Sequence, residues 1–109
     1  VNSLILPTNR ARDPIVLGKT IASRYANQRM YLLVPGQQFD VTGTRHGRGG
    51  GWYDRFLSVL PTHWVRIGIA RADQLSSSPL IRRPWDQPMD WVLIYNGVWQ
   101  VYETGARSF

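Results

Sequence analysis

Glycines and arginines are concentrated in one short stretch of the chain, between Val34 and Leu57. Within it four glycines fall in five positions and two arginines alternate with them: Gly47, Gly49, Gly50 and Gly51, with Arg45 and Arg48. Glycine lets the backbone adopt positive φ angles and turn successive N–H groups into a concave surface. An apolar helical pattern follows directly, and the N-terminal end of a helix attracts anions. The stretch therefore predicts a phosphate-binding loop.

The polar side chains of this loop have two interpretations. Arg45 and Arg48 form either a solvated basic turn or contacts to phosphate, and phosphate is favoured because the neighbouring glycines have no competing side chains. His46 lies within the loop and His63 precedes a strand pattern. Neither histidine has a partner pattern typical of catalysis or metal binding.

One acidic residue, Asp54, lies at the start of the predicted helix over residues 52–60. At roughly 100° per residue, six side chains form an apolar arc, and Asp54, Arg55 and Ser58 lie outside it; the arc is Trp52, Tyr53, Phe56, Leu57, Val59 and Leu60. Asp54 either complements the helix dipole, worth ~0.3–1 kcal/mol, or binds Mg²⁺ beside phosphate, since Mg²⁺ is usually held by one or two carboxylates plus phosphate oxygens.

Two common nucleotide-binding loops are excluded. GxxxxGK[ST] is absent, and the only lysine, Lys19, lies far from the glycines. GxGxxG also fails, because Trp52 stands three residues after Gly49.

Two further acids, Asp86 and Asp90, precede a strand pattern. Pro84 and Pro88 forbid an ordinary helix around them. From the residues alone, these acids are either turn formers or members of a metal site.

The stretch VPGxxFDxxGxRxGRGGGxYDRFL resembles the signature of the 5-formyltetrahydrofolate cyclo-ligases, also called methenyltetrahydrofolate synthetases. The resemblance continues through Ile67–Ala70, Asp73–Leu75 and Asp86–Val92, and covers roughly Tyr31 to Val98. It implies an α/β fold and ATP-dependent conversion of 5-formyltetrahydrofolate to 5,10-methenyltetrahydrofolate, with ATP as co-substrate and Mg²⁺ as cofactor.

The same resemblance implies roles for individual residues. Arg48 and Asp54 would be catalytic, Asp54 and Asp86 would share Mg²⁺, and Asp90 would be structural. The reduced folate would contact Arg48, Gly49, Gly50, Gly51 and Trp52, where Trp52 replaces a tyrosine or phenylalanine and keeps an aromatic wall for a pterin. ATP would contact the whole loop: Arg45, His46, Gly47, Arg48, Gly49, Gly50, Gly51, Trp52 and Tyr53.

Composition narrows the class of protein. Thirteen basic residues, twelve of them arginine, against seven acidic residues give a net charge of +6. Arginine suits a polyanionic ligand, although an arginine-rich codon preference gives the same bias. A small nucleic-acid binder with twelve arginines and five tryptophans is a further alternative, disfavoured because no recognisable nucleic-acid motif is present. The absence of cysteine excludes disulfides, cysteine-ligated zinc and a thiol nucleophile.

The length of 109 residues predicts a single domain, over residues 1–109 with a tail at 103–109. No apolar run reaches the ~20 residues that span a bilayer, so we expect a cytoplasmic protein without membrane partners. Family members have an additional N-terminal part that Val1–Met30 does not match. The chain is then a fragment, a trimmed form or part of a larger assembly. A second chain or homo-oligomer supplies the missing elements, or the chain binds nucleotide without the full activity.

Secondary-structure patterns predict an α/β domain: a mainly parallel sheet with flanking helices and a C-terminal antiparallel hairpin. Expected strands are Leu4–Leu6, Met30–Val34 and Trp64–Ala70, the second read as buried on both faces. Trp91–Tyr95 and Val98–Tyr102, joined by Asn96-Gly97, predict a hairpin with a type I′ turn.

The segment after Asp13-Pro14 has two interpretations. The pair is typical of a helix start, and Ile15, Ile21 and Tyr25 give a stripe for a helix continuing to Ala26. Gly18 disfavours a helix, which leaves a strand over Ile15–Leu17 as the alternative.

Overall fold

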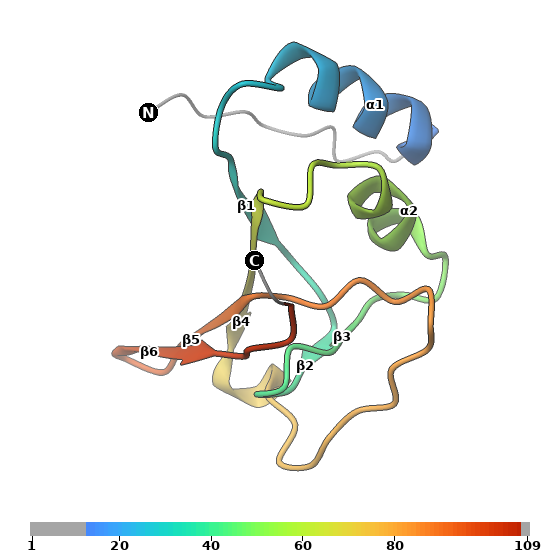
Figure 1. The fold of residues 1–109 in the computed structure, drawn as a ribbon. Helices are drawn as coiled ribbons and strands as arrows, with labels where there is room; N and C mark the ends of the chain where they lie inside the picture. Colours follow the sequence, from blue (N-terminus) through green and yellow to red (C-terminus); the bar gives the residue numbers. More distant parts are fainter. Residues whose placement is uncertain (1–12, 108–109) are drawn as a thin grey trace.

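The centre of the molecule is a four-stranded sheet in the order β1-β4-β5-β6 (Figure 1). The computed structural model describes residues 13–107. Strand β4 pairs in parallel with β1 and β5, and β5 pairs antiparallel with β6. The bounds are β1 Tyr31–Val34, β4 Val65–Arg71, β5 Trp91–Tyr95 and β6 Trp99–Glu103. The predicted α/β class, with its mainly parallel sheet and C-terminal hairpin, is confirmed.

Two helices, α1 (Pro14–Arg24) and α2 (Trp52–Ser58), pack against each other at one end of the sheet (Figure 1). Asp13 caps α1, because its Oδ1 accepts a hydrogen bond of 2.8 Å from the N–H of Ile15. The helix interpretation of this segment is therefore correct and the strand alternative is wrong. The expected strand Leu4–Leu6 lies outside the described residues.

Gly18 lies inside α1 because the two helices approach closely there. A Cβ at this position would lie 2.5 Å from Val59 Cγ2 and 2.9 Å from the carbonyl oxygen of Phe56. The buried stripe of α1 consequently includes Leu17, Gly18 and Ile21, whereas Ile15 is only half-buried. The close contact offsets the cost of a helical glycine.

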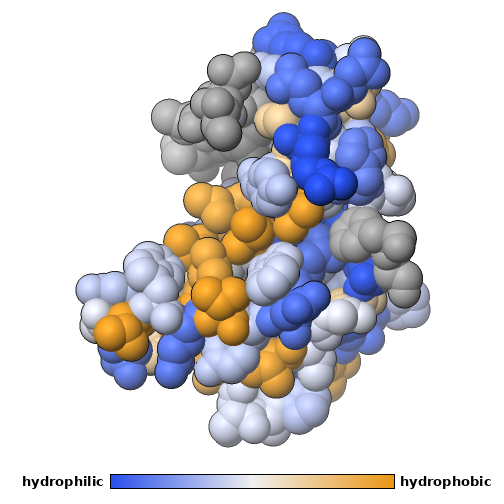
Figure 2. Space-filling model, turned by 60° about the vertical axis from the view of Figure 1, so that its left-hand side comes forward, coloured by the Kyte–Doolittle hydropathy of each residue, from blue (hydrophilic) through white to orange (hydrophobic). Residues whose placement is uncertain are grey.

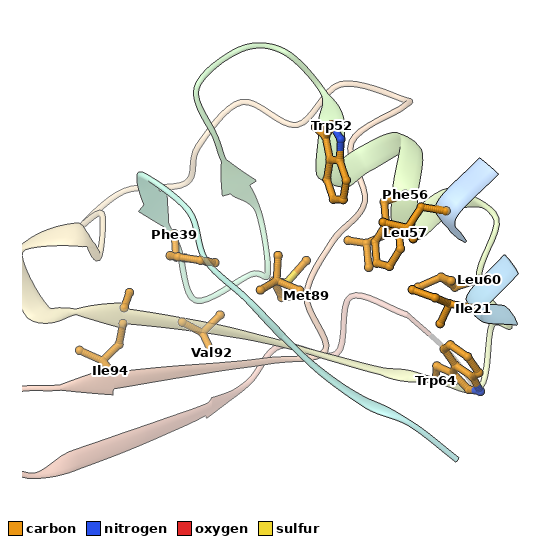
Figure 3. Close-up of a cluster of buried hydrophobic side chains, with 13 residues drawn as sticks. Ile21, Phe39, Trp52, Phe56, Leu57, Leu60, Trp64, Met89, Val92 and Ile94 are labelled. Carbon is orange, nitrogen blue, oxygen red and sulfur yellow. The ribbon is translucent and has the colours of Figure 1, made fainter. Parts of the chain in front are cut away.

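The hydrophobic core lies between one face of the sheet and the layer formed by the helices and the chain around Phe39 (Figure 3). Phe39 packs directly over β4, where a Cβ on Gly68 would lie 2.4 Å from its ring. A second group of core side chains joins α2 to the start of β4; it comprises Ile21, Trp52, Phe56, Leu57, Leu60 and Trp64. Thus the core links the helices to the segment that leads into the glycine loop.

The other face of the sheet is apolar and exposed, which corrects the expectation that Met30–Val34 is buried on both faces. In β1, Tyr31 is 60% exposed and Leu33 is 59% exposed, and only Val34 is buried. The pairing places Ile67, Leu93 and Val101 on the same face as Leu33. Figure 2 shows the resulting apolar surface across this side of the molecule. Among the described residues, the helices cover only the opposite face.

The C-terminal region differs from its prediction in two details. Tyr95 pairs with Trp99, so the hairpin loop contains three residues with Gly97 at φ +75° rather than a two-residue type I′ turn. Of the expected tail at 103–109, Glu103 ends β6, and Arg107 donates to the carboxylate of Asp90 at 2.8 Å. The described part of this segment is thus fixed to the core.

No helix among residues 13–107 is both long and apolar enough to cross a membrane.

Candidate phosphate- and metal-binding site

A short antiparallel hairpin positions the glycine loop. Strands β2 (Gln38–Phe39) and β3 (Arg45–His46) pair Gln38 with His46 and Phe39 with Arg45. The sequence patterns did not indicate these two-residue strands. The loop begins where β3 ends and runs into α2, with Gly49 at φ +98° and Gly51 at φ +67°. Positive φ angles are therefore used at two of the four glycines.

The loop lines a cavity of about 260 Å³ together with a segment more than 30 residues away in the sequence. Every residue expected at the site lies on it, joined by two further residues of the distant segment, Arg83 and Trp85. The lining residues are Arg45, His46, Gly47, Arg48, Gly49, Gly50, Gly51, Trp52, Tyr53, Asp54, Arg83, Trp85 and Asp86. The fold thus brings Asp54 and Asp86 to one cavity.

One oxygen of each of the two carboxylates accepts a hydrogen bond from a backbone N–H group. Asp54 Oδ1 accepts a 2.9 Å hydrogen bond from the N–H of Gln87, and Asp86 Oδ2 accepts a 2.9 Å hydrogen bond from the N–H of Arg83. Within the described part of the chain, the second oxygen of each carboxylate has no protein partner. Both acids are therefore fixed in orientation and still have an oxygen available for a ligand.

The donor set suits Mg²⁺ beside phosphate. Residues 13–107 contain no group of three or more His, Cys, Asp or Glu side chains that would enclose a metal ion. Two carboxylates alone leave most of an octahedral shell to water and phosphate oxygens, which is the usual environment of Mg²⁺ in phosphate-binding proteins.

The two loop arginines differ in environment. Arg48 is exposed at the cavity. Arg45 is buried; its Nε donates to the carbonyl oxygen of Pro35 at 2.6 Å, and its guanidinium lies 4.8 Å from the centre of the Tyr53 ring. Arg45 therefore also ties the loop to the end of β1, and Arg48 is the more exposed cation.

His46 and Trp52 line the cavity and also make structural contacts. His46 Nε2 lies 2.7 Å from the carbonyl oxygen of Ile81, which can only accept, so Nε2 carries the proton. Trp52 is buried and stacks on Phe56 with ring centres 5.3 Å apart. Its ring belongs largely to the core.

Sequence reasoning missed several residues at the cavity. Trp85, at 63% exposure, lines both this cavity and a neighbouring hollow of about 640 Å³ that is also lined by Gly49–Gly51 and Asp54. Arg55 Nη1 donates to the carbonyl oxygen of Gly50 at 2.9 Å and supports the loop. Arg83 also lines the cavity. The only available signal was the position of Trp85 and Arg83 close to Asp86.

Asp40 fastens the distant segment to the β2–β3 turn. Its Oδ1 accepts hydrogen bonds from Thr42 and Thr44, and its Oδ2 accepts from the N–H of Leu80 at 2.7 Å. Burial raises the pKa of Asp40, but the hydrogen bonds from Leu80, Thr42 and Thr44 outweigh it and hold the pKa below its ordinary value. The charged form is therefore stabilised in the folded protein.

We expect Asp40→Asn to lower the free energy of unfolding by about 1.5–3 kcal/mol near neutral pH, the range for hydrogen bonds to a charged group. Because the folded-state pKa is depressed, this contribution is present above the unfolded pKa of 3.8 and is lost as the pH falls through the folded value. Urea unfolding of both proteins at a series of pH values tests this. A difference in stability that stays constant down to about pH 3 would contradict the role of the charge.

Comparison with known proteins gives the chain its family. The family model described as the 5-formyltetrahydrofolate cyclo-ligase family matches residues 5–95. The chain belongs to this family. It is 34% identical over 67 residues to the 5-formyltetrahydrofolate cyclo-ligase of Mycoplasma pneumoniae, covering 62% of this chain and 40% of that protein. It is 35% identical over 78 residues to a probable 5-formyltetrahydrofolate cyclo-ligase of Caenorhabditis elegans, covering 67% of this chain and 37% of that protein.

A solved structure agrees with the family assignment. The 5,10-methenyltetrahydrofolate synthetase of Aquifex aeolicus superimposes with a TM-score of 0.57 at 32% identity, over 73% of this chain and 39% of that one. The chain thus spans about two fifths of the length of the cyclo-ligase relatives it matches.

Proposed function

We propose that this chain binds ATP with Mg²⁺ at the glycine loop and contributes this site to the conversion of 5-formyltetrahydrofolate to 5,10-methenyltetrahydrofolate. The observation that carries the proposal is the meeting of Asp54 and Asp86 at a cavity lined by glycines and arginines. Each acid has one oxygen fixed and one without a protein partner within the described residues. This arrangement supports a carboxylate-held metal beside phosphate.

The proposed roles of the cavity residues follow from their charges. Arg48 and the loop N–H groups would bind the phosphates. Arg45, which is fixed to the end of β1, would add a second positive charge beside the phosphates. Asp54 and Asp86 would hold Mg²⁺, which neutralises phosphate charge when bound. In the family reaction the formyl oxygen attacks the γ-phosphorus, ADP leaves, and N10 then closes onto the activated carbon with loss of phosphate. These steps need positioning and charge neutralisation rather than a nucleophilic side chain.

For the folate, the proposed contacts are Arg48, Gly49–Gly51 and Trp52. Trp52 is only 7% exposed, whereas Trp85 beside it on the cavity is 63% exposed. Trp85 therefore offers the larger aromatic surface for stacking by a pterin or an adenine.

The exposed apolar face of the sheet supports a further part of the proposal. Contiguous apolar surface at Tyr31, Leu33, Trp99 and Val101 is typical of an interface. We propose that a second chain or another copy of this chain packs on this face and contributes to the ATP and folate sites. A nucleotide-binding protein without the full activity remains the alternative when no such partner chain is present.

We expect the purified chain alone to show weak or no cyclo-ligase turnover. Each missing charge-assisted contact to a transferring phosphoryl group lowers the rate by about 10²–10³-fold. The assay follows methenyltetrahydrofolate absorbance with ATP, Mg²⁺ and 5-formyltetrahydrofolate, with Asp54→Asn as the control. Turnover at ordinary enzymatic rates that the control abolishes would show that this chain already has all the contacts the reaction needs.

A further inference from the structure

Arg66 is a buried arginine on the core face of β4. It is 4% exposed; its Nη1 donates to Gln87 Oε1 at 2.8 Å and its Nη2 to the carbonyl oxygen of Leu57 at 3.3 Å. Burial, followed by the charge of Arg107, lowers the pKa of Arg66 to about 10, so the guanidinium remains charged at neutral pH. A buried charge is costly and its retention calls for an explanation.

The ion pair nearest to Arg66 does not use its guanidinium. Asp90 accepts hydrogen bonds from Arg107 Nε at 2.9 Å and Arg107 Nη2 at 2.8 Å, and from the backbone N–H of Arg66 at 2.9 Å. Within residues 13–107 the Arg66 guanidinium therefore bonds only to neutral acceptors. Of the two acceptors, Leu57 lies in α2, whereas Gln87 lies in the irregular segment before β5.

Gln87 connects three parts of the site. Its side chain accepts from Arg66, its backbone N–H donates to Asp54 Oδ1 at 2.9 Å, and it directly follows Asp86. Arg66 itself does not line the cavity. The charges of Asp90 and, to a smaller extent, Asp54 raise the pKa of Arg66 against the effect of burial, so both act favourably on the buried cation.

We propose that Arg66 is a positioning residue: through Gln87 it holds the segment that carries Asp86 against Asp54, so that both carboxylates face one cavity. The role in Mg²⁺ binding rests on the proposed function, whereas the role in fixing the segment does not. Removal of Arg66 leaves a hole in the core and risks unfolding, so the tests use its partner Gln87.

The first measurement is amide hydrogen exchange of the protein without ligand. Gln87→Met keeps the length of the side chain and removes the acceptor for Arg66. We expect exchange at Asp86 and Gln87 to increase about tenfold, while the amides of β4 and β5 stay protected. Gln74→Met is the matched control, because it removes the side-chain hydrogen bonds of another half-buried glutamine, to Gly36 and Arg71, away from the cavity. Unchanged exchange at Asp86 and Gln87 would overturn the proposal regardless of any ligand.

The second measurement is the Mg²⁺ concentration that gives half-maximal ATP binding. Gln87→Met should raise it by about 10–100-fold, as for other groups that orient metal ligands. Gln87→Glu retains the acceptor and should restore it, and Gln74→Met should leave it unchanged. If the wild type shows no Mg²⁺-dependent ATP binding, the proposed function fails and the exchange result alone decides the role of Arg66. If the wild type binds and Gln87→Met behaves identically, the positioning role is wrong.

Discussion

Asp54→Asn should weaken Mg²⁺-dependent ATP binding by about 10²-fold, because loss of a metal ligand should cost at least as much as the about 10–100-fold loss seen when a group that only orients a ligand is removed. The asparagine amide oxygen still accepts from the N–H of Gln87, so the fold around the cavity is kept. What is lost is the negative charge on the oxygen without a protein partner among the described residues. Isothermal titration calorimetry with ATP and Mg²⁺ measures the effect.

A reversal of the effect between Mg²⁺ and EDTA separates a metal ligand from a dipole-capping acid. In EDTA, Asp54→Asn removes a like charge next to phosphate and should bind ATP at least as tightly as the wild type. Asp73→Asn makes the same change in net charge at an exposed residue remote from the cavity, where 72% of the side chain is accessible. Tighter ATP binding by Asp54→Asn both with and without Mg²⁺ would contradict a metal-binding role.

Asp90→Asn is expected to lower the free energy of unfolding by about 3–5 kcal/mol, the cost of removing one partner of a buried ion pair. Arg107 and Asp90 form a pair of 2.8 Å in which their side chains are 15% and 6% exposed. Asp90 also accepts from the N–H of Arg66 at the start of β4. The substitution leaves the charge of Arg107 acting on the buried Arg66 cation without the opposing charge of Asp90.

The control for this prediction is Asp73→Asn, which breaks the pair between Arg71 and Asp73. Both of its side chains are 72% exposed. Solvent screening limits such pairs to about 0–1 kcal/mol, so urea unfolding should show a small effect. Equal losses in the two variants would mean that the Asp90 pair does not stabilise the fold as a buried ion pair.

The strands and helices with strong local patterns could be predicted from the sequence, whereas the burial of each of their faces could not. The apolar run Met30–Val34 indicated a strand buried on both faces, yet Leu33 is exposed. A continuous apolar run is the same whether the second face is covered by this chain, by another chain or by solvent. Burial on that face depends on elements that the run itself does not contain.

The candidate site shows a similar division. The glycine loop and the nearby acid Asp54 were recognisable because their spacing is local. The contacts that complete the site join residues 33 or more positions apart, as between Asp54 and Gln87 or between Asp40 and Leu80. The Arg66–Gln87 contact had no local signal, and Trp85 had only its position next to Asp86, because a single tryptophan or glutamine in an irregular segment fits many arrangements.

The most direct test of the account is a nuclear magnetic resonance titration of the ¹⁵N-labelled chain with ATP in the presence and absence of Mg²⁺. In the proposed complex ATP binds at the glycine loop, and Asp54 and Asp86 would hold Mg²⁺. We expect Mg²⁺-dependent shifts in the amides of Gly47, Gly49, Gly50, Gly51 and Gln87, with the exposed sheet face around Leu33 and Trp99 unchanged. Saturable shifts confined to that face, or ATP binding that is indifferent to Mg²⁺, would contradict the claim.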